Sequence, residues 1–199
     1  MVGIVKKRLL AALLLIAALT GLTACKSYGN AKKAAGDVQK FYSGISAVSS
    51  KYKITSDFNE RVNEFTLNYT KKKEENATVT VLEPKEISGI SAKISQDTLE
   101  LSYEGSSLAV AFPEIRGYSP LEALPGILLE LKNGVPAEVG SEKISGDECV
   151  TLTYEEKVEK QAVTKRIWID EKTLFPVKAE LYTGGSAVLS LEFLTFSAE

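Results

Sequence analysis

After residue 44, most of the chain alternates between apolar and polar residues, and this alternation constrains the fold more than any other feature of the sequence. A period of two places one face of a strand in the core and the other in solvent, which is typical of antiparallel sheets. Polar or glycine-containing turns separate the runs, so we expect neighbouring runs to pair as a meander. The alternating runs are 64–70, 78–81, 90–94, 99–103, 108–112, 150–154, 163–169, 177–181 and 189–193.

Two segments have helical spacing instead. The first, 30–43, precedes the strands. The second, 117–132, opens with Ser119-Pro120 and carries one apolar stripe, and we expect Pro125 to kink or split it. The sequence therefore predicts an α+β fold with one N-terminal helix, a large antiparallel sheet and a helical insertion after about the sixth strand.

The N-terminus has the consecutive parts of a secretory signal. Basic residues occupy positions 6–8, and the uncharged apolar stretch Leu9–Leu19 follows. Its eleven residues match the apolar core of a signal peptide, whereas a membrane-spanning helix needs about 20 apolar residues. The stretch Leu22-Thr23-Ala24-Cys25 then resembles the lipobox of bacterial lipoprotein precursors.

The lipobox resemblance implies that the Cys25 thiol takes a diacylglyceryl group through a thioether and that a peptidase cuts just before it. Two acyl chains anchor a protein stably, whereas one does so only marginally. The implied organisation is a removed signal peptide (1–24), a lipidated tether (25–29) and a single domain (30–199), anchored at the extracytoplasmic face of the cell membrane. The alternative is an ordinary secretory signal in which Cys25 plays no part.

The composition excludes several classes of function. The chain has no histidine, which removes Ser-His-Asp and Cys-His catalysis and any His-containing metal site. Without residues 1–24 it has 21 basic and 26 acidic residues, and this net charge of −5 argues against nucleic acid as a partner. Acidic pairs such as Glu155-Glu156 lie beside lysines and are predicted to be solvated turns. We therefore expect no catalytic residues, no metal and no cofactor.

One segment carries a likeness to a known family. In Trp168–Glu180 a strand ends in a turn formed by Asp170 and Thr173, and Pro176 opens the next strand, where no ladder donor is needed. This segment and the order of elements resemble the superfamily of the periplasmic lipoprotein carrier (LolA-like) and its lipoprotein relatives, some of which act in spore germination. The resemblance implies a curved antiparallel half-barrel whose mouth is covered by helices, with 117–132 as an inserted helical lid.

The resemblance leaves two functions open, and neither is catalytic. In the first, the concave sheet face and the second helix enclose a hydrophobic ligand, a lipid or an acyl chain. In the second, the protein's own side chains fill the cavity and the outer surface binds a protein partner, such as a cell-wall amidase. The residues predicted to line the ligand site are Phe65, Leu67, Tyr69, Val79, Val81, Leu124, Ile127 and Leu128.

Trp168, the single tryptophan of the chain, is out of phase with its strand. Ile167 and Ile169 flank it, so they face the other side of the sheet. Either this strand is buried on both faces or Trp168 belongs to an exposed contact patch. We expect the former, with Trp168 packed under the N-terminal helix.

Replacing Cys25 tests the lipobox. A serine hydroxyl cannot form the thioether, so Cys25→Ser should leave the precursor uncleaved and unlabelled by radioactive fatty acid. The measurement is fatty-acid labelling read together with the gel shift of the precursor. Cys149→Ser is the matched control and should be labelled like the parent chain. Labelling that persists in Cys25→Ser would contradict lipidation at this residue.

Overall fold

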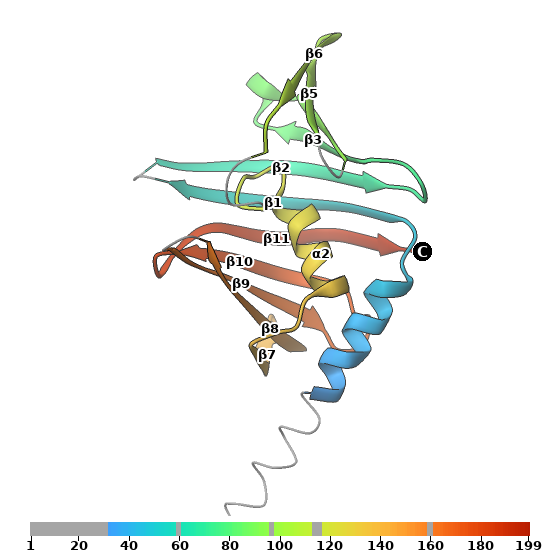
Figure 1. Cartoon of the computed structure of the whole chain (residues 1–199), viewed down its shortest axis with the longest axis vertical. Coiled ribbons are helices and arrows are strands. Elements are labelled where there is room, and N and C mark those ends of the chain that lie inside the picture. Colours follow the sequence, from blue (N-terminus) through green and yellow to red (C-terminus); the bar gives the residue numbers. More distant parts are fainter. Residues whose placement is uncertain (1–31, 59–60, 96–97, 113–116, 159–160) are drawn as a thin grey trace, which may run out of the picture.

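A single antiparallel sheet dominates the structure. The computed structural model describes residues 32–58, 61–95, 98–112, 117–158 and 161–199, and eleven strands of this part form one sheet (Figure 1). A helix at 32–44, the N-terminal helix, and helix α2 (Ala123–Asn133) accompany it. The strands and the short 3₁₀ helix are β1 (Val48–Phe58), β2 (Arg61–Lys71), β3 (Ala77–Glu83), η1 (Lys85–Ile87), β4 (Ser91–Ile94), β5 (Leu99–Tyr103), β6 (Ser106–Val110), β7 (Glu138–Ile144), β8 (Asp147–Val158), β9 (Gln161–Asp170), β10 (Pro176–Thr183) and β11 (Ser186–Ala198).

The first and the last strand lie side by side in the interior of the sheet. The strand order is β6-β5-β4-β3-β2-β1-β11-β10-β9-β8-β7. The chain therefore runs outward from β1 to β6, restarts at the other edge with β7 and returns to β11, with α2 as the connection between the two halves (Figure 1). The predicted α+β class, the antiparallel meander and the helical insertion after the sixth strand are confirmed. The sheet is open, as a half-barrel requires, with β6 and β7 at its edges.

One face of the sheet encloses the core together with both helices. The predicted alternation is present in the central strands, and β1 buries every second residue over Val48–Ser56. Ile54 and Leu67 of the sheet belong to the same buried cluster as Val38 of the N-terminal helix and Leu124 of α2. Burying one large apolar side chain is worth about 1.5–3 kcal/mol, so the stability of the domain depends mainly on this face.

Side-chain hydrogen bonds and aromatic contacts fix the N-terminal helix, and Ser43 Oγ and Gln39 Nε2 donate to Lys132 O and Gly134 O at the end of α2, at 3.3 and 3.4 Å. Tyr42 Oη donates to Leu174 O at 3.0 Å. The rings of Phe41 and Phe175 pack with their centroids 6.1 Å apart. Leu174 and Phe175 lie in the turn between β9 and β10, so these contacts hold the helix at that end of the sheet.

The predicted signal peptide, the tether and Cys25 lie outside the described residues. Cleavage and lipidation therefore stay predictions from the sequence. Among the described residues, no helix is both long enough and apolar enough to cross a bilayer.

α2 begins later than the sequence predicts, and it is not kinked. The predicted start at Ser119 is a turn, in which the backbone N–H groups of Glu122 and Ala123 donate to Ser119 O at 3.0 and 2.9 Å. Pro125 consequently falls in the first turn of the helix, where backbone N–H groups have no partner within the helix and a missing donor does no harm. The predicted kink or split is wrong because the helix starts only two residues before this proline and runs unbroken to Asn133.

Trp168 is buried although it faces away from the core. Its side chain is 3% exposed, and its indole N–H donates to Glu142 Oε2 at 2.7 Å. Arg166 and Lys178 lie over the ring, with their cationic groups 4.7 and 5.0 Å from its centroid. At Trp168, β9 is thus buried on both faces, as predicted. The cover over Trp168 is made by polar side chains of the sheet and not by the N-terminal helix, which packs into the core on the opposite face.

Removing the hydroxyl groups of two buried tyrosines should change the free energy of unfolding in opposite directions. Tyr52 is 0% exposed, and its hydroxyl has no hydrogen-bond partner within the described part of the chain. A buried unpaired hydroxyl costs about 1–3 kcal/mol, so Tyr52→Phe should raise the free energy of unfolding by about 1 kcal/mol. Tyr42→Phe, the matched control, removes the hydrogen bond to Leu174 and should lower it by about 1 kcal/mol. Denaturant unfolding checks both signs, and a less stable Tyr52→Phe would contradict the prediction.

Candidate functional site

The predicted ligand face forms one continuous part of the core. All eight predicted residues belong to the main buried cluster or pack directly against it. Phe65 and Leu128 are partly buried. The other six are 0–4% exposed, and they are Leu67, Tyr69, Val79, Val81, Leu124 and Ile127. The structure therefore brings together every described residue of the predicted site, with the side chains packed as a core.

α2 covers this face with a single apolar stripe. Its buried residues recur at helical spacing, and they are Ala123, Leu124, Ile127 and Leu131. Leu129 points the other way and is 62% exposed. In Figure 1 the helix lies across the central strands, in front of β1 and β11. The stripe of α2 thus occupies the surface on which the sequence places an apolar ligand.

The loop that leads into α2 passes very close to the helix. A Cβ built on Gly126 would lie 3.1 Å from Gly117 Cα, closer than side chains normally pack. Gly117 itself has a φ of +80°, a backbone conformation that favours glycine. The small size of both residues therefore lets the loop press against the first half of α2.

An ion pair joins the second half of α2 to the sheet. Lys165 of β9 occupies an inward position between Val163 and Ile167, and its Nζ lies 2.7 Å from Glu130 Oε1 of α2. The Lys165 side chain is 9% exposed and that of Glu130 is 26% exposed. A buried charge without a partner is far more costly than a buried pair. Lys165 therefore requires Glu130, and the pair fixes the position of α2 along β9.

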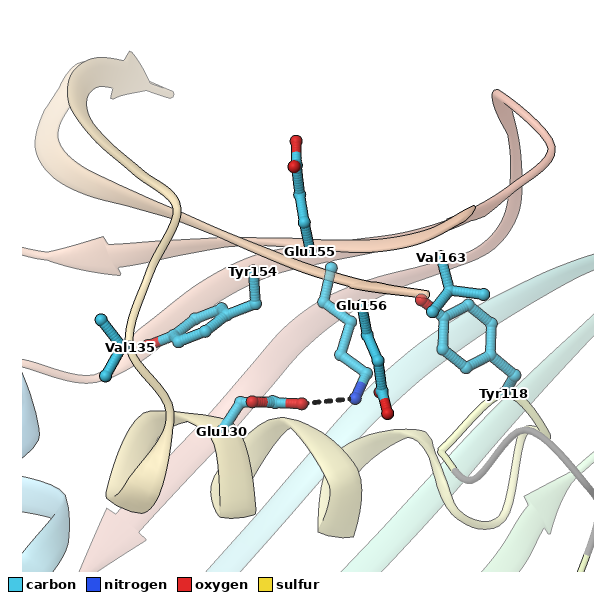
Figure 2. Close-up of a pocket in the computed structure, with 8 residues that line it drawn as sticks. Tyr118, Glu130, Val135, Tyr154, Glu155, Glu156 and Val163 are labelled. Atoms are coloured by element: carbon cyan, nitrogen blue, oxygen red, sulfur yellow. Dashed lines mark hydrogen bonds and ion pairs between the residues drawn. The ribbon is translucent and has the colours of Figure 1, made fainter. Parts of the chain in front are cut away.

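A polar cleft of about 330 Å³ lies beside this ion pair (Figure 2). In Figure 2, Tyr154 and Tyr118 lie at opposite ends of the cleft, and Glu156 points toward α2 while Glu155 points away from it. The lining residues are Tyr118, Glu130, Val135, Tyr154, Glu155, Glu156, Val163 and Lys165. Four of these eight are charged, so the cleft differs in kind from the apolar site that the sequence predicts.

Both tyrosines of the cleft stay neutral. Burial raises the pKa of Tyr118 above its ordinary value, and the carboxylates of Glu156 and Glu130 raise it further. Burial, followed by the charge of Glu130, raises the pKa of Tyr154 in the same way. Both phenols therefore keep their protons at neutral and mildly alkaline pH, and Tyr118 Oη donates to Thr164 O at 3.1 Å.

Sequence reasoning assigned none of these cleft residues to a site. It predicts Glu155-Glu156 as a solvated turn, whereas the structure places both in β8 as exposed strand residues, with the Glu156 side chain at the cleft. One signal was present in the sequence. Lys165 holds the inward phase of an apolar alternation, and a lysine at such a position needs a carboxylate from another element.

The chemistry of the cleft suits binding of polar groups. It offers carboxylates, one paired ammonium and two neutral phenols. Among the residues that the structure describes, no three His, Cys, Asp or Glu side chains gather as a metal site would need. Glu130 and Lys165, which line the cleft, also hold α2 on the sheet, so an occupant of the cleft would contact the groups that position the helix.

Several solved structures are similar to this chain. An uncharacterized protein from Thermus thermophilus matches with a TM-score of 0.54 at 8% identity, over 84% of this chain and 87% of that chain. A LolA superfamily protein from Nitrosomonas europaea matches at 0.42 and 12% identity, over 85% and 93% of the two chains. The complex of the CwlD amidase with the GerS lipoprotein from Clostridioides difficile contains a match at 0.42 and 17% identity, over 84% and 95%. No family model and no curated protein matches the sequence.

At 8% identity, the likeness to the Thermus thermophilus protein concerns the fold alone. The open, curved antiparallel sheet that the resemblance to the LolA-like superfamily implies is the fold observed here, and membership of that superfamily stays a prediction. The fold and the site thus define a protein with an open, curved antiparallel sheet whose apolar face is filled by its own side chains beneath α2.

Breaking the ion pair between α2 and β9 should destabilise the domain. Glu130→Gln preserves the size of the side chain but leaves the Lys165 ammonium buried without a counter-charge. Losing one partner of a fully buried pair costs about 3–5 kcal/mol, and because Glu130 is partly exposed we expect about 2 kcal/mol and a lower Tm in thermal unfolding. Glu75→Gln, the same change at an exposed turn residue, is the matched control. Equal Tm values for the two variants would show that the pair does not hold the helix.

Proposed function

We propose that this chain is a membrane-anchored, extracytoplasmic lipoprotein that acts by binding and not by catalysis. The signal-like N-terminus and the lipobox at Cys25 support the anchor. The short tether, 25–29, would keep the domain close to the bilayer. The net charge of −5 without residues 1–24 suits a solvated domain beside the membrane.

The filled apolar face supports a protein partner as the main function. Leu124, Ile127 and Leu131 of α2 are 0–1% exposed and occupy the face that a lipid would need. A lipid would have to displace them, whereas a protein can bind the outer surface of the domain as it stands. We therefore propose an interaction role, with a protein of the cell envelope, such as a cell-wall amidase, as the kind of partner.

A second function, binding of a lipid or acyl chain with α2 as a lid, has one observation in its favour. α2 meets the core through three fully buried large apolar side chains, one alanine and the partly buried Leu128. Burial of the three is worth about 1.5–3 kcal/mol each. An acyl chain that buried about ten methylenes would gain about 8 kcal/mol. The two energies are of the same order, so an acyl chain could compensate for the apolar contacts of α2, and it would in addition have to separate Glu130 from Lys165.

Native mass spectrometry of the full-length, lipidated protein in mild detergent distinguishes the two functions. The interaction role predicts a mass equal to the protein and its anchor, and a defined protein partner recovered by cross-linking in intact cells. The lipid role predicts an additional acyl-chain mass that survives purification. If cross-linking yields no partner and the bound lipid is stoichiometric, the interaction role is wrong.

Neighbouring leucines of α2 give a sharp test of which face of the helix matters. Leu128 packs against the core, whereas Leu129 is 62% exposed. Leu128→Asp should lower Tm by several degrees and release any bound lipid, because it places a charge against the apolar face. Leu129→Asp, the matched control, should change neither property. The opposite ranking in thermal unfolding would mean that α2 does not cover the sheet with this face.

A further inference from the structure

The two edges of the sheet differ in charge. Within the described part of the chain, β7 and β6 are the outermost strands. β7 has the sequence EVGSEKI, with three exposed charged side chains. β6 has the sequence SSLAV, with no charged residue and no proline, and its first four residues are exposed.

Such a difference matters because an edge strand presents unpaired backbone N–H and C=O groups to other chains. Charged side chains, prolines and bulges normally protect edges from pairing. β7 has the first of these protections. β6 has none of them, since it pairs with β5 in unbroken register from Leu99↔Val110 to Tyr103↔Ser106. The outer side of β6 therefore provides a regular, uncharged ladder.

The apolar face of the sheet also reaches this edge. A row of paired residues crosses the strands from the core outward, and it consists of Tyr69, Val79, Ala92, Leu101 and Leu108. Tyr69, Val79 and Ala92 are 0–2% exposed, whereas Leu108 is 66% exposed. The row thus extends past the buried core to the exposed Leu108. A further strand beside β6 would cover this side chain.

We propose that this further strand is β6 of a second copy of the chain. Antiparallel pairing of β6 with itself around a two-fold axis at Leu108 sets Leu108 opposite Leu108 and Ser107 opposite Ala109. On the concave face Leu108 then meets Leu108 and Val110 meets Ser106, on the other face two small side chains meet, and no like charges oppose each other. The result is a closed dimer in which the two sheets continue into one another.

The charged residues of β7 explain why we propose that β6 pairs with β6 of the second copy and not with its β7. Pairing of β6 with β7 of another copy would be head-to-tail and could repeat without limit. Glu138, Glu142 and Lys143 on β7 oppose that arrangement, because they would face an uncharged strand and lose solvation. Pairing of β6 with itself uses one edge of each copy and leaves both charged edges in solvent.

The dimer does not depend on whether the domain binds a protein or a lipid. It does gain from the proposed membrane anchor, because tethered copies share a surface and their effective concentration rises. A five-residue strand pair is a small interface, and such an interface forms more readily between tethered copies.

Disulfide trapping in membranes from cells that produce the full chain tests the proposal. Residues directly opposite in an antiparallel pair have Cα atoms about 4.5–5.5 Å apart, which lies within the span of about 4.4–6.8 Å that a disulfide bridges. Leu108→Cys should therefore give a disulfide-linked dimer on mild oxidation. Ser141→Cys, on the β7 edge, is the matched control and should stay at the level of the parent chain.

The register supplies a second readout. Ser107→Cys and Ala109→Cys, each alone, should cross-link less than Leu108→Cys, and the two variants produced together should form a mixed dimer. Leu108→Lys, which places a charge on the edge, should abolish the dimer seen by light scattering of the detergent-solubilised protein. No cross-link above the parent level for Leu108→Cys would overturn the proposal. So would a cross-link from Leu108→Cys to a different protein, or equal cross-linking from Ser141→Cys.

Discussion

The pairing of β1 with β11 is the constraint on which the rest of the domain depends. It runs from Val48↔Ala198 to Ser56↔Leu189, and the backbone of Glu199 extends it to Ala47. Without it the sheet would separate into β1–β6 and β7–β11, and the core residues of each half would lose their neighbours in the other. Contacts between residues so far apart in sequence must overcome a large loop-closure entropy. We therefore expect the central pairing to limit the rate of folding.

α2 reinforces this joint between the halves. Its ion pair attaches it to Lys165 in the second half, while its apolar stripe shares a cluster with Leu67 and Val79 in the first half. The helix is therefore both the covalent connection and a non-covalent bridge. This double role explains how a short helix can cover a wide sheet, because each of its ends is fixed to something different: the loop at Gly117 and the lysine of β9.

The alternation of apolar residues predicted the class and most of the strands, and together with the helical stripe in 117–132 it predicted the eight residues that the structure brings together in one apolar cluster. It missed β1 because two inward positions of that strand are serines, Ser50 and Ser56, which are 1% and 5% exposed. Ser50 is accommodated because its hydroxyl donates to Thr195 O at 2.8 Å, a partner from the far end of the chain. β7 was missed because five of its seven residues are glycine, serine or charged, and its two apolar residues, Val139 and Ile144, do not alternate in phase. The sequence could show that Lys165 needed a carboxylate, but the choice of Glu130 depends on how α2 lies on the sheet.

The close contact between Gly117 and Gly126 has a mechanical consequence. α2 is a rigid rod of about 16 Å, and Glu130 lies about one turn beyond Gly126. A single methyl group at position 126 would require a shift of a few tenths of an ångström, and the rod would pass that shift directly to the carboxylate. Because position 126 carries a hydrogen atom in place of a methyl group, the helix can pack closely against the loop. A substitution at Gly126 would therefore change how closely the helix packs on the sheet without altering any residue of the apolar face.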